Sequence, residues 1–171
     1  MFVKQLSIFV ENKSGRLADI IDAIAAAGID IRAVSIADTT DFGILRLIVD
    51  KPDEAEKALK SMGLTVRLTD VIAIEISDTP GGFASALNVL KDRDVEIEYA
   101  YAFISRDEGR ACVILRVDDN DKAIKLFGEN GVKILRQQYL YNVKEPARSL
   151  KGSAPVLCYF FIISLKIASL S

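Results

Sequence analysis

The hydrophobic pattern changes period early in the chain. Residues 2–10 alternate apolar and polar side chains, as in a half-buried strand, whereas apolar residues then recur at helical spacing up to Gly28. The polar segment N-K-S-G-R-L (12–17) separates the two stretches. The pattern next predicts strands at 29–36 and 44–49, with a turn at 38–41 between them, a helix from Pro52 to Gly63 and a strand at 64–68.

The second half of the chain repeats this order. A shift of 66 residues places Ile72 on Leu6 and Ala86 on Ile20, and it places D-T-P-G-G-F (78–83) on the segment 12–17. After the middle strands the shift becomes 68, as for Ala55 and Ala123. The repeat predicts strands at 71–76, 95–104, 110–117 and 132–139 and helices at 82–91 and 121–129. A shift that changes only at a loop indicates a duplication.

Each half therefore has the order β-α-β-β-α-β. This order predicts an α+β fold of two ferredoxin-like βαββαβ units, each with an antiparallel sheet and its helices on one face. We expect the units at 1–69 and 70–143. Residues 65–76, which cross this boundary, form an almost unbroken strand-like stretch. This stretch predicts a rigid fusion of the two units rather than a flexible linker.

The expected tail, 144–171, is a polar linker followed by an apolar segment. About ten uninterrupted apolar residues precede Lys166, whereas a membrane-spanning helix needs about 20. Two main interpretations stay open: the segment docks on a partner or on a neighbouring sheet, or it is a non-native extension with no evolved role. Association of the tail with a membrane is a further alternative.

Composition argues against several classes of function. The chain has 22 basic and 24 acidic residues, so it has no broad positive field to attract nucleic acid or an anionic membrane. It has no histidine, the commonest general base and metal ligand. Cys112 and Cys158 form neither a disulfide framework nor a metal-ligand pattern. The N-terminal pattern lacks a secretory signal. We expect a cytoplasmic protein that is not an enzyme and uses no cofactor or metal.

The two glycine-containing turns offer binding chemistry. The first N–H groups of the following helix lack partners within the helix and suit an anion. Gly15 and Gly81 allow a ligand to approach the backbone, and Asn12 and Asp78 can accept from an ammonium group. Donors for a carboxylate beside acceptors for an ammonium group describe an amino-acid site. The alternative is that Asn12 and Asp78 only cap helices and the glycines only turn the chain.

Both halves resemble the ACT domain family, in which an apolar strand is followed by N/D-x-P-G-x-L, a helix, and G-[IV]-[ND]-[IV] at the start of the second strand. The first half has N-K-S-G-R-L and G-I-D-I (28–31); the second has D-T-P-G-G-F and D-V-E-I (94–97). Ser14, Phe83 and Asp94 depart from the pattern. The resemblance covers about residues 2–140 and implies a tandem ACT protein.

ACT domains bind amino acids between two copies, through the Gly-turn of one and the second-strand start of its neighbour. The resemblance implies an allosteric regulator of amino-acid metabolism, a homodimer, with an amino acid as ligand and a metabolic enzyme as a further partner. The candidate contacts in the first half are Asn12, Ser14, Gly15, Arg16, Leu17, Ile29, Asp30 and Ile31. Those in the second half are Asp78, Pro80, Gly81, Gly82, Phe83, Val95, Glu96 and Ile97.

Roles for individual residues remain open. Asp30 and Glu96 suit an ammonium group, or they are solvated strand residues. Arg16, Arg32 and Arg46 are candidates for selecting an acidic side chain, or they are solvated.

Other functions stay as alternatives. One is a subunit that dimerises with a metabolic enzyme without binding ligand. Another is a nucleic-acid-binding translational regulator, with Tyr99, Tyr101 and Phe103 as a stacking platform. Residues 110–117 lack the signature of RNA-recognition folds, and contact with the sheet of another copy also explains the three aromatic residues. A phosphatase of the same topology needs a loop with more backbone donors than 12–17 provides.

Overall fold

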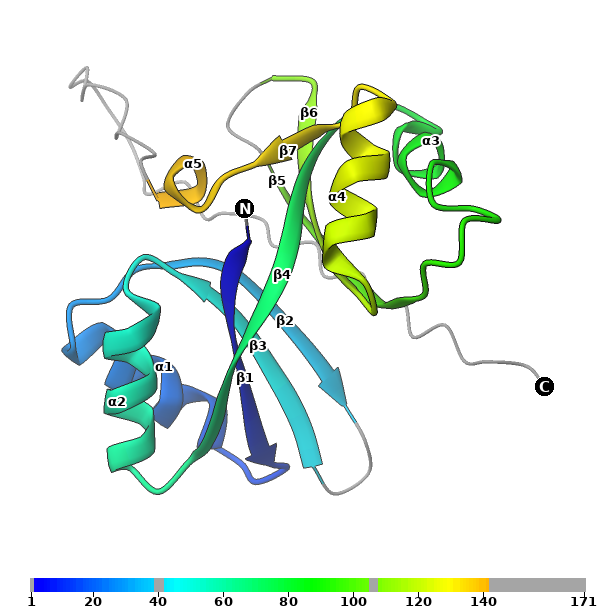
Figure 1. Cartoon of the computed structure of the whole chain (residues 1–171). Helices are drawn as coiled ribbons and strands as arrows, with labels where there is room; N and C mark the ends of the chain where they lie inside the picture. Colours follow the sequence, from blue (N-terminus) through cyan, green and yellow to red (C-terminus); the bar gives the residue numbers. More distant parts are fainter. Residues whose placement is uncertain (1, 39–41, 105–107, 142–171) are drawn as a thin grey trace, which may run out of the picture.

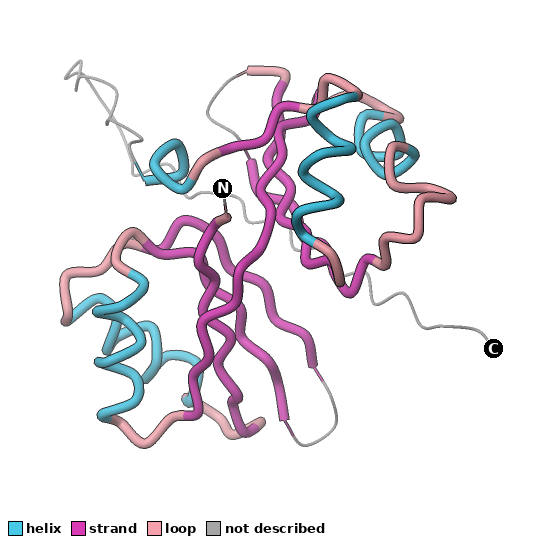
Figure 2. The backbone as a smooth tube through the Cα atoms, in the orientation of Figure 1, coloured by secondary structure: helices cyan, strands magenta, loops and turns pink. Residues whose placement is uncertain are grey.

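The computed structural model describes residues 2–38, 42–104 and 108–141. The predicted turn at 38–41 lies outside these residues except for residue 38, and the predicted tail at 144–171 lies wholly outside them. Figures 1 and 2 show two units whose sheets lie toward the middle of the molecule and whose main helices lie on the outer sides. The elements are β1 (Val3–Glu11), α1 (Arg16–Ala26), β2 (Ile31–Asp38), β3 (Phe42–Val49), α2 (Pro52–Ser61), β4 (Thr65–Ser77), α3 (Gly82–Asn88), β5 (Ile97–Ile104), β6 (Arg110–Val117), α4 (Asn120–Glu129), β7 (Lys133–Leu135) and α5 (Gln137–Tyr141).

All strand pairs of the sheet are antiparallel. The strand order is β2-β3-β1-β4-β6-β5, and β7 also pairs with β4. The first unit therefore has the order β2-β3-β1-β4 and the second has β5-β6-β4-β7, which is the ferredoxin-like order in both cases. The predicted α+β fold with two βαββαβ units is confirmed.

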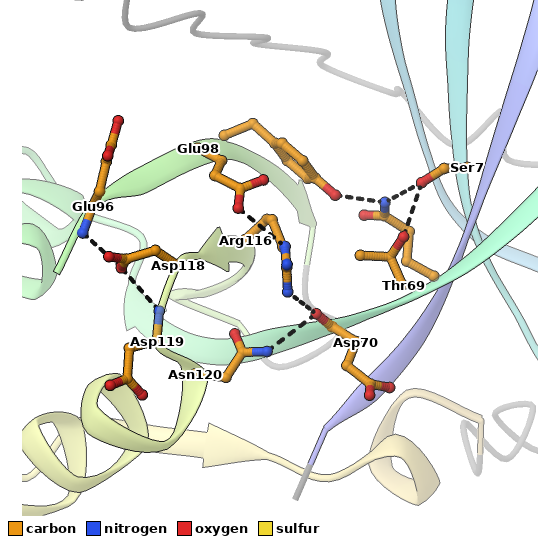
Figure 3. A network of polar contacts seen from close by, with 11 residues as sticks. Ser7, Thr69, Asp70, Glu96, Glu98, Arg116, Asp118, Asp119 and Asn120 are labelled. Atoms are coloured by element: carbon orange, nitrogen blue, oxygen red, sulfur yellow. Dashed lines mark hydrogen bonds and ion pairs between the residues drawn. The ribbon is translucent and has the colours of Figure 1, made fainter.

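One long strand, β4, belongs to both units. Its first part pairs with β1 up to Val71, and its second part pairs with β6 from Ile72 onward (Figure 1). The sequence explains the length, since β-branched residues are frequent and neither glycine nor proline interrupts it. Where the partner changes, the backbone carbonyl of Asp70 accepts from the side chains of Arg116 at 3.1 Å and Asn120 at 3.3 Å (Figure 3). The two predicted strands at 64–68 and 71–76 are thus one strand.

Each unit has its own core between sheet and helices, and a third cluster joins the units. The first core includes Leu6 and Ile24, and the second includes Ile74 and Phe127. The third lies on the helix-free sheet faces and combines residues of the first unit with residues of the second: Val3, Ala33, Ile48, Val71, Ala73, Tyr101, Cys112, Ile114, Leu135 and Leu140. The sheets therefore pack face to face across the chain.

The aromatic side chains of β5 contribute to this contact between units. Tyr101 is 3% exposed, and its hydroxyl donates to Gln5 Oε1 of β1 at 3.0 Å. The guanidinium of Arg46 lies over the Tyr99 ring, 3.9 Å from the centroid. Phe103 packs against the same cluster. Contact with another sheet, one of the two sequence-based interpretations of these aromatics, is confirmed within the chain.

The structure also corrects two other predicted elements. The helix predicted at 82–91 ends at Asn88, and the chain continues as turns with i→i−3 bonds before Asp92 and Asp94 adopt left-handed backbone angles. The strand predicted at 132–139 ends at Leu135, and the chain then forms α5, which places Leu140 in the cluster between the units. No helix in the described ranges is long and apolar enough to cross a membrane.

Candidate functional site

The first Gly-turn leaves two backbone donors available. Gly15 is the N-cap of α1 with φ +83°, so the capping residue has no side chain to accept from the first turn. Arg16 N donates to Lys13 O and Asp19 N donates to Gly15 O. The N–H groups of Leu17 and Ala18 have no hydrogen-bond partner in the part of the chain that the structure describes. This turn can therefore accept a carboxylate.

The second Gly-turn has the same backbone but a tighter packing. Gly81 is the N-cap of α3 with φ +87°. A Cβ atom on Gly82 would lie 2.1 Å from the backbone oxygen of Ser77, so only glycine fits there. The close approach of α3 to the end of β4 explains Gly82 without any ligand.

The candidate side chains divide into exposed and core residues. Leu17 is 42% exposed, whereas its counterpart Phe83 packs against the core of the second unit. Ile29 is 6% exposed, so its side chain faces the core rather than a ligand. The other candidates at or just before the second-strand starts that pack against the cores are Ile31, Val95 and Ile97. Exposed positions are Asn12, Ser14, Gly15, Asp30, Asp78, Pro80, Gly81 and Glu96, while Arg16 and Gly82 are intermediate.

An aspartate holds the start of the second strand in each unit. Asp50 Oδ1 accepts from Asp30 N at 2.8 Å, and Asp118 Oδ1 accepts from Glu96 N at 2.8 Å (Figure 3). Sequence reasoning missed both aspartates. They lie 68 positions apart, which is the shift that relates Ala55 to Ala123, so the sequence repeat could have identified them as equivalent residues.

The two acidic candidates are not equivalent. The Asp30 carboxylate pairs with Arg32 Nη2 at 2.9 Å. The Glu96 side chain is exposed and makes no ion pair or side-chain hydrogen bond with the described residues. Of the two, Glu96 is therefore the carboxylate available to an ammonium group.

In the first unit the sheet register separates the two halves of the expected site. Glu11, at the end of β1, pairs with Phe42 at the start of β3. Ile31, at the start of β2, pairs with Val49 at the end of β3. The Gly-turn and the second-strand start therefore lie at opposite ends of one sheet.

The second unit shows the same separation. Its Gly-turn follows Ser77, which pairs with Arg110 at the start of β6, whereas Ile97 pairs with Val117 at the end of β6. In both units the Gly-turn lies at the end away from the place where β4 changes partner, and the second-strand start lies near it. The chain by itself thus brings no turn together with a second-strand start.

Charges near the first turn are largely paired. Lys13 forms an ion pair with Glu11, and this hydrogen bond and charge lower the pKa of the Glu11 carboxyl. Arg16 contributes a smaller effect of the same sign. No group of three or more Cys, Asp or Glu residues in the described segments has metal-binding geometry.

Comparisons with known proteins agree with this geometry. A family model described as an ACT domain pair matches residues 1–144. A crystal structure of a Bacteroides thetaiotaomicron protein is 43% identical, with a TM-score of 0.78, and the match covers 84% of this chain and 98% of that one. No curated protein matches the sequence.

Two more distant structures share the fold. The regulatory subunit of aspartate kinase from Thermus thermophilus, in its ligand-free form, is 19% identical with a TM-score of 0.56. The corresponding subunit from Thermus flavus is 18% identical with a TM-score of 0.53. Each match covers 74% of this chain and 90% of the other.

Proposed function

The chain belongs to the ACT domain pair family, and from this we propose that it is a non-catalytic, cytoplasmic amino-acid sensor that regulates an enzyme of amino-acid metabolism. The observation that carries the proposal is the pair of glycine N-caps, each of which leaves two first-turn N–H groups without a partner in the described chain. The fold shared with regulatory subunits of aspartate kinase supports a regulatory role.

Of the two Gly-turns, the one in the first unit is better suited to bind a ligand. Its helix α1 is 11 residues long, against seven for α3, and Leu17 is exposed where Phe83 is packed in a core. We place the ligand carboxylate on the N–H groups of Leu17 and Ala18. Because the register keeps second-strand starts away from this turn, a neighbouring copy supplies the group that binds the ammonium, and Glu96 is the better of the two acidic candidates.

Calorimetric titration of the full chain against each of the twenty amino acids tests the proposal. At least one amino acid should bind, and Gly15→Ala should weaken that binding at least tenfold, because the added Cβ disfavours φ +83° and narrows the approach to the turn. Gly131→Ala is the matched control, since Gly131 also has a positive φ, +71°, and has open space around its Cβ position.

Absence of binding by all twenty amino acids to folded protein overturns the sensor. Co-purification of the same protein with an enzyme then favours the alternative, a subunit that dimerises with that enzyme without a ligand. Equal loss of binding in both glycine variants removes the assignment of the carboxylate to the first turn.

A further inference from the structure

A row of polar residues crosses the helix-free face of the first unit. Arg46 of β3 pairs with Ser35 of β2 and with Ser7 of β1, and Ser7 pairs with Arg67 of β4. Paired residues of antiparallel strands point to the same face, so the four side chains are neighbours on it. We call them the Arg46 row. Ser35 is 1% exposed, Arg46 and Ser7 are partly exposed and Arg67 is exposed, so the row is open to solvent at its Arg67 end.

The equivalent row of the second unit is almost entirely apolar. Its members are Tyr101, Ile114, Ala73 and Leu135. All four are buried in the cluster that joins the units. Packing of the helix-free faces therefore accounts for the row in the second unit. It does not account for two arginines and two serines at the same positions in the first.

The two arginines have no counter-charge in the part of the chain that the structure describes. The ion pairs there involve other residues, and the adjacent rows of this face contain no acidic residue. Arg46 Nε is buried and has no hydrogen-bond partner among the described residues. Its stacking on the Tyr99 ring orients the guanidinium but supplies no carboxylate. An anion at the Nη groups would stabilise this partly desolvated cation.

Two hydroxyl groups beside the arginines can donate to the same anion. Gln5 Nε2 donates to Ser7 Oγ at 3.0 Å and to the Tyr99 hydroxyl oxygen at 2.8 Å (Figure 3). Because both oxygens accept from one nitrogen, the two hydroxyls lie close together and each keeps its own proton to donate. The contact of Ser7 Oγ with Thr69 Oγ1, at 3.4 Å, is longer than an ordinary hydrogen bond between hydroxyls.

The spacing of the arginines suits one doubly charged group. Arg46 and Arg67 lie on the two strands that flank β1, so their Cα atoms are about 10 Å apart. Both side chains are long enough to reach a group above Ser7, between them. A phosphate monoester carries close to two negative charges at neutral pH and has three strong acceptor oxygens, which match two guanidinium groups and the hydroxyls. A single carboxylate neutralises only one of the two arginines.

We propose that the Arg46 row binds the phosphate group of a small phosphate monoester. Arg46 and Arg67 flank the phosphate, and the hydroxyls of Ser7 and Tyr99 donate to its oxygens. The site lies along the middle of β1 rather than at a Gly-turn, and it does not rest on the proposed function. Because Tyr99 belongs to the second unit and the other three residues to the first, bound phosphate bridges the units and stabilises the folded chain.

Calorimetric titration of the full chain with glycerol phosphate and with inorganic phosphate tests the site. Glycerol phosphate should bind, and Arg46→Gln and Arg67→Gln should each weaken its binding at least about tenfold, because each removes one of the two guanidinium groups. Arg46→Lys keeps the charge but not the planar fork, so it should retain only part of the affinity. Arg93→Gln is the matched control, since Arg93 is an exposed arginine in the turns after α3 and its loss changes the net charge equally.

Three outcomes overturn the site: a folded wild-type chain that does not bind glycerol phosphate at millimolar concentrations, an Arg67→Gln variant that binds it normally, or equal weakening by Arg93→Gln. Tighter binding of inorganic phosphate, or of the dicarboxylate succinate, overturns the assignment to a monoester. Circular dichroism verifies folding, and the exposed position of Arg67 keeps its variant informative if Arg46→Gln does not fold. Amino-acid titration of the same protein tests the proposed function separately, and failure of either titration leaves the other result standing.

Discussion

Gln5 Nε2 donates a 2.8 Å hydrogen bond to the hydroxyl oxygen of Tyr99, 94 positions later in the chain. The Tyr101 hydroxyl in turn donates to Gln5 Oε1 at 3.0 Å, so both ends of one amide from the first unit are bound by the second. Gln5 is fully buried. Apolar packing alone permits the units to slide, whereas these directional bonds fix one orientation of the two sheets.

The first prediction concerns this amide. Tyr101→Phe should lower the free energy of unfolding by about 1–3 kcal/mol, because it removes the O–H donor from a buried carbonyl oxygen and leaves the ring in place. Urea denaturation measures the change. In a double-mutant cycle with Gln5→Leu the effect of Tyr101→Phe should shrink by at least about 0.5 kcal/mol. Additive effects would show that the hydrogen bond contributes nothing to the contact between units.

The second prediction concerns alkaline pH. Burial raises the pKa of the Tyr101 hydroxyl well above its ordinary value, with a further increase from Tyr99 and an opposing effect of Arg46. The unfolded chain releases this proton near pH 10, where the folded protein still holds it. The folded state thus binds more protons, and the stability that the neutral hydroxyl provides is complete below about pH 10 and is lost as the pH rises toward the folded pKa.

Urea denaturation between pH 8 and pH 11.5 measures this loss. Tyr101→Phe should make the decline above pH 10 shallower, since the group that titrates is gone. An identical decline in the variant and the wild-type protein would assign the alkaline loss of stability to other groups.

The third prediction is that alanine has opposite effects on stability at two glycines with different surroundings. Gly82→Ala should destabilise the protein by more than about 2 kcal/mol, because its Cβ meets a backbone oxygen at 2.1 Å and the chain must move. Gly128→Ala, in α4 with open space around its Cβ position, should instead stabilise by up to about 1 kcal/mol. Thermal unfolding of both variants gives the comparison. Tolerance of alanine at position 82 would mean that α3 does not approach β4 this closely.

Much of the fold follows from periodicity in the sequence. The bounds of β6 are as predicted, and those of β1 and α4 differ by one residue at each affected end, because each has a clear period and a clear stop. The end of the chain is different. The segment 132–139 has a strand-like composition, and α5 forms because Leu140 then enters the cluster between the units, a tertiary contact that no local pattern contains.

The sequence likewise predicted some features of the candidate site but not others. Both glycine N-caps were visible as turns, and the separation of turn and second-strand start follows from the βαββαβ order, since the first two strands run parallel. The steric role of Gly82 was not visible, because it depends on the distance to Ser77, which is set by how α3 packs. The ion pair of Asp30 with Arg32 likewise depends on side-chain geometry.

The fourth prediction concerns the aspartate that stands where the first unit has a glycine. Asp94 has φ +49° and its counterpart Gly28 has φ +65°, so both adopt the left-handed conformation that is unfavourable for a residue with a Cβ. The Asp94 carbonyl accepts from Lys122 Nζ at 2.9 Å, and this bond does not depend on the side chain. Asp94→Gly should therefore stabilise the protein by about 0.5–1 kcal/mol. This is a net value, because the relief of backbone strain is partly offset by the larger conformational entropy of glycine in the unfolded chain.

The reciprocal variant Gly28→Asp serves as the matched control. It introduces the same strain in the first unit, where Lys51 Nζ donates to the Gly28 carbonyl at 3.2 Å, and it should destabilise by a comparable amount. Chemical denaturation of the two single variants and of the double variant gives the three free energies. If Asp94→Gly lowers stability, the Asp94 carboxylate makes a favourable interaction that outweighs its backbone strain, and the second-strand start of the second unit then has a polar role that the first unit lacks.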